Sequence, residues 1–211
     1  MLGRCHLITD TRYGRDPLAL VAPALDAGFE VVQVRVKELG DRDALAVVEV
    51  ALGLCSRYRA TCIVDDRLDV ALLAGADGVH LGAEDLPVER ARALAGPDLL
   101  IGATVRDPAG AEAAVAAGAS YLGTGPAFTT STKVGLPAPI GLEGVAAVAS
   151  AVTVPVVAIG GVTAAHVADL VAAGAHGVAV IGALSDASDP GAAAAEIVAR
   201  MSAAVPGRGD R

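Results

Sequence analysis

The sequence predicts a single-domain α/β fold, a (β/α)8 TIM barrel, because short apolar runs alternate with alanine-rich segments along the chain. Four Ala-Gly pairs, at 27–28, 74–75, 117–118 and 173–174, each close an alanine-rich segment, and an apolar run follows each pair. The four glycines lie 47, 43 and 56 residues apart. Each interval holds about two strand–helix units, since one βαβ unit needs roughly 30 residues.

Eight apolar runs are the expected strands: His6–Thr9, Val31–Val34, Cys62–Val64, Gly78–Leu81, Leu100–Ala103, Tyr121–Gly123, Val156–Ile159 and Gly177–Ile181. Such runs are typical of parallel strands that are buried on both faces. The glycine that closes each alanine-rich segment suits the left-handed residue that ends a helix. An open doubly wound sheet is the alternative, but no G-x-G-x-x-G motif follows the first run. We expect one domain over 1–205 and a disordered tail at 206–211.

Composition and charge argue against several classes of function. The 211-residue chain is 54% hydrophobic and carries a net charge of −8, so we expect no binding to nucleic acid or anionic membranes. The longest apolar stretch, Val145–Val162, contains proline and glycine and is expected to form a helix, a turn and a strand rather than a membrane span. Cys5, Cys55 and Cys62 lack CxxC spacing, and no signal peptide is evident. We therefore expect reduced thiols in a cytoplasmic protein.

The segment after the sixth run has the chemistry of an anion site. It contains Gly123-Thr124-Gly125-Pro126 and then Thr129-Thr130-Ser131-Thr132-Lys133. Glycines let backbone N–H groups approach a ligand, hydroxyls donate hydrogen bonds, and the lysine adds a point charge. A hydroxyl-rich turn that binds nothing is the alternative interpretation.

Cationic and amide side chains follow the second run. Gln33, Arg35 and Lys37 alternate with Val34 and Val36, so the three polar side chains are expected to point the same way. In a barrel, that direction is the mouth at the carboxyl ends of the strands. The spacing therefore predicts a clamp for an anion, with a solvated strand end as the alternative.

Carboxylates end the third and fourth runs. Asp65, Asp66 and Asp85 are expected on the same rim as the cationic clamp. Hard oxygen ligands beside a phosphate site indicate Mg²⁺, which proteins usually hold through one or two carboxylates and phosphate oxygens. Alternatively, Asp65 or Asp66 caps a helix that begins near Arg67, and Asp85 caps a helix that begins near Pro87.

A second, uncharged subsite is expected after the seventh and eighth runs. Gly160-Gly161 and Ile181-Gly182 follow these runs, where such barrels often hold phosphate on backbone N–H groups, and Thr163 is expected to cap the next helix. His80 lies inside an apolar run and is interpreted as a core histidine. No nucleophile and base can be paired, which favours chemistry driven by positioning and electrostatics.

These stretches together resemble the thiamine phosphate synthase family over residues 5 to 203. The resemblance is carried by Leu7-Ile8-Thr9-Asp10, Val32-Gln33-Val34-Arg35-Val36-Lys37, Asp66-Arg67-Leu68-Asp69-Val70-Ala71, Ala74 to Gly82, Glu84-Asp85-Leu86-Pro87, Gly123-Thr124-Gly125-Pro126, Thr130-Ser131-Thr132-Lys133, Ala158-Ile159-Gly160-Gly161 and Gly174 to Val180. It implies a TIM-barrel transferase that joins 4-amino-2-methyl-5-(diphosphomethyl)pyrimidine to thiazole phosphate, with Mg²⁺ as cofactor, and releases thiamine phosphate and diphosphate.

The resemblance also implies a role for each matching residue. The pyrimidine diphosphate would be held by Gln33, Val34, Arg35, Val36, Lys37 and Lys133, of which Arg35, Lys37 and Lys133 would be catalytic. Mg²⁺ would be held by Asp66 and Asp85. Thiazole phosphate would be held by Thr130, Ser131, Thr132, Gly161, Ile181 and Gly182, and Asp65 and Thr104 would complete the substrate site.

Several residues depart from the family pattern. The family usually has asparagine at Asp65, serine at Thr104 and at Gly182, and often histidine at Arg106. A carboxylate at 65 would repel diphosphate unless the metal or Arg67 neutralises it, and the charge of Arg106 is expected to compensate. A related thiazole tautomerase and a barrel that binds thiamine precursors without turnover are the alternatives. The sequence also leaves a homo-oligomer open.

Overall fold

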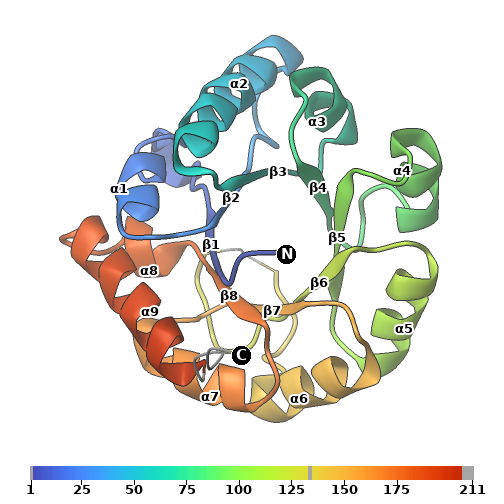
Figure 1. Ribbon diagram of the computed structural model, residues 1–211, viewed down its shortest axis with the longest axis vertical. Coiled ribbons are helices and arrows are strands. Elements are labelled where there is room, and N and C mark those ends of the chain that lie inside the picture. The colour runs from blue at the N-terminus through green and yellow to red at the C-terminus, as the bar shows by residue number, and fades with distance from the viewer. Residues whose placement is uncertain (1, 133–134, 206–211) are drawn as a thin grey trace, which may run out of the picture.

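The computed structural model describes residues 2–132 and 135–205, and within them eight parallel strands close into a barrel (Figure 1). The strands are β1 (Cys5–Ile8), β2 (Val31–Val34), β3 (Thr61–Asp65), β4 (Gly78–Leu81), β5 (Leu100–Val105), β6 (Tyr121–Thr124), β7 (Val156–Ile159) and β8 (Gly177–Val180). Each strand pairs with its neighbour in sequence, and β8 closes on β1 with Leu7 opposite Val180. The predicted (β/α)8 barrel is confirmed, and the alternative prediction of an open doubly wound sheet is wrong.

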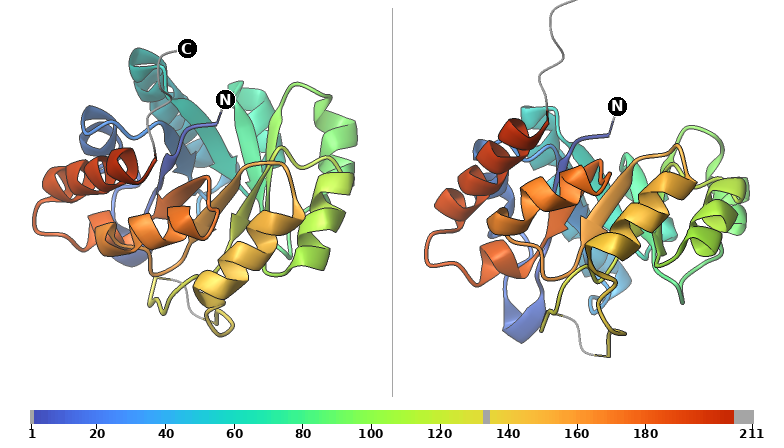
Figure 2. Two further views of the ribbon diagram at one scale, coloured as in Figure 1. Left: turned by 60° about the horizontal axis from the view of Figure 1, so that its bottom comes forward. Right: turned by 90° about the horizontal axis from the view of Figure 1, so that it is seen from below.

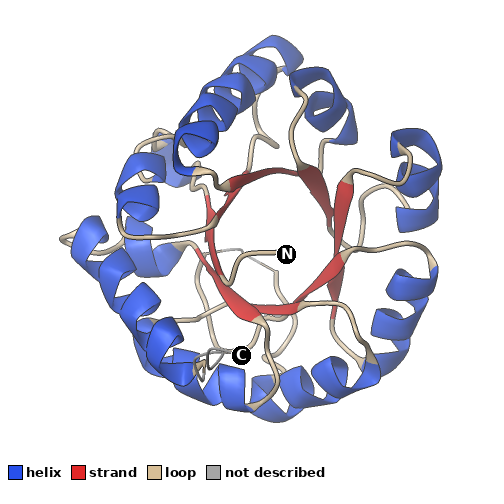
Figure 3. Ribbon diagram, in the orientation of Figure 1, coloured by secondary structure: helices blue, strands red, loops and turns tan. Residues whose placement is uncertain are grey.

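Helices surround the barrel and form its outer layer (Figure 3). They are η1 (Arg12–Gly14), α1 (Val21–Asp26), α2 (Asp41–Tyr58), α3 (Leu68–Ala74), α4 (Val88–Ala95), α5 (Pro108–Ala116), α6 (Gly141–Ala151), η2 (Ala164–His166), α7 (Val167–Ala172), α8 (Gly182–Ser185) and α9 (Pro190–Ala204). Among the described residues no helix has the length and apolarity needed to cross a membrane. The stretch Val145–Val162 forms the expected end of α6, a turn and β7.

The repeated glycines end helices as predicted. All four have positive φ angles, from 68° at Gly75 to 102° at Gly28, in the region that favours glycine. Each therefore lets the chain leave a helix and turn back into the next strand. The repeated Ala-Gly pairs of the sequence therefore correspond to a turn that recurs between a helix and the next strand.

The core has two layers, separated by the wall of the barrel. Side chains inside the barrel include Ile8, Ile63, Tyr121 and Val157, and they form a small cluster of their own. The larger layer lies between strands and helices, where fully buried alanines and valines allow close packing. Cys5, Cys55 and Cys62 are free and buried, in agreement with the sequence analysis.

The two ends of the barrel differ. In Figure 2 the N-terminal segment lies at one end, and the loop between β6 and α6 extends from the other. The second end carries the carboxyl ends of the strands, where the candidate site residues gather. The tail at 206–211, predicted to be disordered, lies outside the described residues.

Candidate active site

The end of β2 carries the predicted clamp. Val34 and Val36 are fully buried in the outer layer of the core, so Gln33, Arg35 and Lys37 point to the opposite side, as their spacing predicts. Any contact of Val34 or Val36 with a ligand therefore has to come from their main chains. The backbone N–H of Arg35 donates to Thr9 Oγ1 at 2.8 Å, which ties the end of β2 to β1.

Lys37 joins the clamp to the carboxylates of β3 and β4. Its Nζ lies 3.0 Å from Asp66 Oδ2 and 3.5 Å from Asp85 Oδ1. Asp66 has a positive φ of 64°, which is unusual for a residue other than glycine and marks a constrained turn after β3. Asp85 also accepts a hydrogen bond from the Gly82 backbone N–H at 2.7 Å. Three strand ends thus converge on one ammonium group.

The capping alternative for these carboxylates is wrong. Helix α3 begins at Leu68 without a side-chain cap, and α4 begins at Val88, also without one.

Burial, and then the neighbouring Asp85, raises the pKa of Asp66. Asp85 makes ionisation of Asp66 less favourable, and a cation placed between the two carboxylates relieves that cost.

Asp65 contacts the other two residues of the clamp, Gln33 and Arg35. Its Oδ1 accepts a hydrogen bond from the Gln33 amide, and its Oδ2 lies 3.8 Å from Arg35 Nε. Burial, and then Asp66, raises the pKa of Asp65 to about 7. Neutralisation by Arg67 is wrong, because Arg67 turns outward to Asp41 at 2.8 Å and Asp69 at 2.6 Å.

Arg106 does not compensate for Asp65. Its guanidinium donates to the Gly125 carbonyl oxygen at 3.1 Å and to the Ala138 carbonyl oxygen at 2.7 Å. These two bonds tie the start and end of the loop after β6. The expected electrostatic role of Arg106 is replaced by a structural one.

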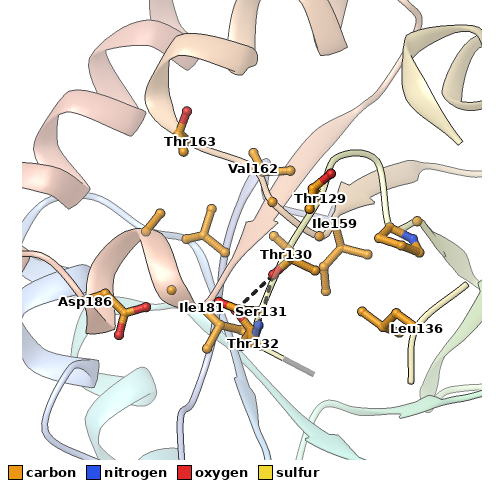
Figure 4. Close-up of a pocket in the computed structure, with 18 of the residues that line it drawn as sticks. Thr129, Thr130, Ser131, Thr132, Leu136, Ile159, Val162, Thr163, Ile181 and Asp186 are labelled. Atoms are coloured by element: carbon orange, nitrogen blue, oxygen red, sulfur yellow. Dashed lines mark hydrogen bonds between the residues drawn. The ribbon is translucent and has the colours of Figure 1, made fainter. Parts of the chain in front are cut away.

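A cavity of about 380 Å³ lies at the same, carboxyl end of the barrel (Figure 4). Its walls come from the ends of β5 to β8 and the loop after β6, namely Thr104, Gly125, Pro126, Thr129, Thr130, Ser131, Thr132, Leu136, Ile159, Gly160, Gly161, Val162, Thr163, Ala179, Val180, Ile181, Gly182, Ala183 and Asp186. The predicted uncharged subsite and the hydroxyl-rich loop therefore line one cavity. Lys133 lies outside the described residues, so its predicted place here stays a prediction.

Glycines let the chain pass close to this cavity. Gly161 has a φ of 68°, and a Cβ there would lie 2.5 Å from the Thr129 carbonyl oxygen. A Cβ at Gly182 would lie 3.1 Å from Asp186 Oδ2 and 3.2 Å from Thr132 Oγ1. The loop after β7 therefore needs glycine at position 161, and a side chain at position 182 would crowd the cavity wall.

The contacts of two groups of polar residues near the site were not predicted from the sequence. Buried Asp10 binds the Arg12 guanidinium through both carboxylate oxygens, at 2.9 and 2.8 Å, and Arg12 reaches Ser185 Oγ at 3.1 Å. These contacts join the ends of β1 and β8. The position of Asp10, just after the first strand, is the signal that could have identified it.

The second group involves His80, which is buried as predicted. Its two ring nitrogens contact Tyr121 and Thr104.

Thr163 and His166 form a reciprocal cap at the start of η2, as expected for Thr163.

The fit to a divalent cation rests on Asp66 and Asp85. Among the described residues, no three His, Cys, Asp or Glu side chains gather into a metal-binding group. Two carboxylates that share one ammonium do suit Mg²⁺, which takes few protein ligands and completes its shell with phosphate oxygens and water.

The family profile, the curated relatives and a solved structure at 36% identity indicate one family. A family profile described as "Thiamine monophosphate synthase" matches residues 5–184. A thiamine-phosphate synthase from Salinispora arenicola is 59% identical over 200 residues, which cover 93% of this chain and 96% of the relative. A thiamine-phosphate synthase from Chlorobium limicola is 45% identical over 192 residues, 90% of each chain. The solved structure of thiamine phosphate pyrophosphorylase from Pyrococcus furiosus superposes with a TM-score of 0.88 at 36% identity, covering 96% of this chain and 97% of that one.

Proposed function

Because this chain belongs to the thiamine monophosphate synthase family, and has the transferase activity of a thiamine-phosphate synthase, we propose how its residues share that reaction. The substrates are 4-amino-2-methyl-5-(diphosphomethyl)pyrimidine and thiazole phosphate, and the products are thiamine phosphate and diphosphate. The observation that carries the proposal is the meeting of Lys37, Asp66 and Asp85 at the carboxyl end of the barrel, the end at which the cavity with the hydroxyl-rich loop also lies.

The charged side of the rim binds the pyrimidine diphosphate. Arg35, Lys37 and Lys133 hold the diphosphate oxygens, and their charge stabilises the negative charge that develops as the carbon–oxygen bond breaks. Gln33 and the main chains of Val34 and Val36 position the same substrate. The support is that Arg35 and Lys37 point to the side of β2 opposite the core valines.

Asp66 and Asp85 hold Mg²⁺ in this proposal. When bound, Mg²⁺ would withdraw charge from the diphosphate oxygens and so improve the leaving group. The support is the convergence of both carboxylates on one cation, Lys37 Nζ. Lys37 would then be available to the diphosphate.

The cavity binds the thiazole phosphate. Thr130, Ser131 and Thr132 offer hydroxyls, while Gly161 and Ile181-Gly182 offer backbone N–H groups. The apolar side chains of Leu136, Ile159 and Val162 line the same cavity and would exclude water from the pyrimidine cation. The thiazole nitrogen then attacks this cation, so the protein needs no nucleophile of its own.

The remaining assignments complete the proposal. Thr104, which lines the cavity, and Asp65, which contacts Gln33 and Arg35, would both contact the pyrimidine substrate. A net charge of −8 supports small molecules rather than nucleic acid or membranes as partners, and three free buried thiols support a cytoplasmic location. Association into a homo-oligomer stays open to measurement by sedimentation.

The test is formation of thiamine phosphate from both precursors with Mg²⁺. Lys37→Met should lower kcat/KM by at least about a hundredfold, since it removes a cation from the developing charge. Arg67→Met is the matched control, because Arg67 is a neighbouring cation that pairs away from the rim, and it should retain most of the activity. Tautomerase activity without coupling, or precursor binding without turnover, would overturn the proposal.

A further inference from the structure

A chain of hydrogen bonds runs across the barrel interior to the cavity. Tyr121, on β6, places its hydroxyl 2.9 Å from His80 Nδ1, on β4. On the other side of the same ring, His80 Nε2 lies 3.0 Å from Thr104 Oγ1, on β5. Tyr121 and His80 are buried, with 2% and 8% of their surface exposed, whereas Thr104 is exposed and lines the cavity.

The barrel makes room for this pair with two glycines. A Cβ at Gly102, on β5, would overlap Tyr121 Cζ and His80 Nδ1. A Cβ at Gly123, on β6, would lie 2.9 Å from His80 Cε1. Since an ordinary side chain at either position would displace the rings, the space inside the barrel is matched to them.

The order of donors and acceptors in the chain follows from burial. Burial raises the pKa of Tyr121 far above its ordinary value, so its hydroxyl keeps its hydrogen. Within the described part of the chain, the buried ring of His80 places its two nitrogens against uncharged hydroxyls, so the ring is neutral. Among the described residues, His80 Nδ1 is the partner that can accept the hydrogen of Tyr121. A neutral ring that accepts at Nδ1 carries its hydrogen at Nε2, and donates it to Thr104 Oγ1.

This order fixes the role of the Thr104 hydroxyl. Because its oxygen already accepts from His80, its own hydrogen is free to turn toward the cavity. We propose that His80 and Tyr121 are positioning residues that make Thr104 a hydrogen-bond donor to an acceptor atom of the bound substrate. The acceptor atom belongs to one of the two substrates named in the proposed function, so this inference rests on that function.

The tautomer of His80 is measured without any substrate. Nitrogen-15 NMR of the full chain labelled at histidine, at neutral pH, should show His80 protonated at Nε2, with its signal assigned by its loss in His80→Gln. His176 provides an internal comparison, since its Nε2 lies 2.9 Å from the Leu2 carbonyl oxygen and must carry the hydrogen. A His80 signal from the Nδ1–H tautomer would overturn the inference, whatever the enzyme's activity.

A double-mutant cycle tests whether the pair acts through Thr104. Tyr121→Phe and Thr104→Val should each lower kcat/KM about tenfold, roughly the effect of one hydrogen bond. The double variant should be no worse than Thr104→Val alone, because the pair has nothing left to orient. Losses that multiply would show that Tyr121 acts by another route, and would overturn the inference.

Conservative variants separate positioning from folding. His80→Gln keeps an N–H near the position of Nε2 and should retain more activity than His80→Leu, and Thr104→Ser, which keeps the hydroxyl, should retain more activity than Thr104→Val. Equal losses in His80→Gln and His80→Leu, with both folded by circular dichroism, would contradict the inference. If the parent itself makes no thiamine phosphate, the proposed function fails, and the NMR measurement still decides the inference.

Discussion

Asp65 holds a largely buried carboxyl group at the end of β3, and Asp65→Asn tests how much the ionisation of that group destabilises the folded protein. The Gln33 amide donates to one of its oxygens, and Arg35 Nε lies 3.8 Å from the other. Burial, and then the charge of Asp66, raises its pKa from 3.8 to about 7. Asparagine keeps the shape and the acceptor for Gln33, but removes the ionisation.

The direction of the effect follows from proton binding. Between about pH 4 and about pH 7 the folded protein holds a proton at Asp65 that the unfolded chain has lost, so this group makes stability fall as pH rises through that window. Below the window the carboxyl is neutral in both states and costs nothing, and above it the cost is complete. The two pKa values differ by about three pH units, which corresponds to at most about 4 kcal/mol. We expect about 1–3 kcal/mol, because water and small rearrangements reduce the cost of a buried charge.

The measurement is urea unfolding of the parent and Asp65→Asn at about pH 5 and about pH 8, without Mg²⁺. The variant should gain about 1–3 kcal/mol over the parent between the lower and the higher pH. Asp41→Asn is the control, because its carboxylate is exposed and should change stability equally at both values.

A stability difference between Asp65→Asn and the parent that is the same at both pH values would refute the reasoning. Coupling activity is the second readout of the same variant. It should be retained or improved, since a carboxylate near a diphosphate repels it. Complete loss of activity would show that the carboxyl has a positive role in the reaction.

Three further substitutions test the rim. Asp85→Ala should raise the Mg²⁺ concentration for half-maximal activity about tenfold, and an unchanged Mg²⁺ titration would remove Asp85 from the metal site. Gly161→Ala places a Cβ 2.5 Å from the Thr129 carbonyl oxygen, so the KM for thiazole phosphate should rise at least about tenfold; an unaltered KM would show that this loop does not hold that substrate. Asp10→Asn breaks a buried bidentate pair with Arg12 and should cost about 3 kcal/mol in urea unfolding, whereas a loss below about 1 kcal/mol would contradict a structural role.

The barrel was predictable because its signals are local. A glycine that ends a helix and an apolar run that follows it are both visible within ten residues, and β2, β4 and β7 have the predicted bounds. The exception of interest is β5, which continues two residues past its predicted end, through Thr104 to Val105. Strand pairing depends on backbone bonds, so a polar side chain that faces the cavity does not end a strand.

For the site residues, the sequence predicted only the side of the strand on which each side chain lies. Period-two spacing gave the correct side for Gln33, Arg35 and Lys37, but the partner of a long charged side chain depends on which neighbours lie within its reach. Arg67 follows Asp65 and Asp66 in sequence, yet binds Asp41 and Asp69 on the outside of the barrel. The His80–Tyr121 pair depends on three strands meeting, which no single segment reveals.

The ion pairs of the rim bear on how a chain with a net charge of −8 would bind the two phosphorylated substrates of the proposed function. Asp10 and Arg12 are mostly buried and joined by two parallel bonds, so a ligand cannot recruit Arg12 without exposing a buried carboxylate. The side chain of Lys37 is 51% exposed and makes single contacts at 3.0 and 3.5 Å, so leaving its carboxylates costs little. Lys37 can therefore change partners more easily than Arg12, and we expect the proposed exchange of carboxylate for diphosphate to depend on this local difference in burial rather than on the total charge.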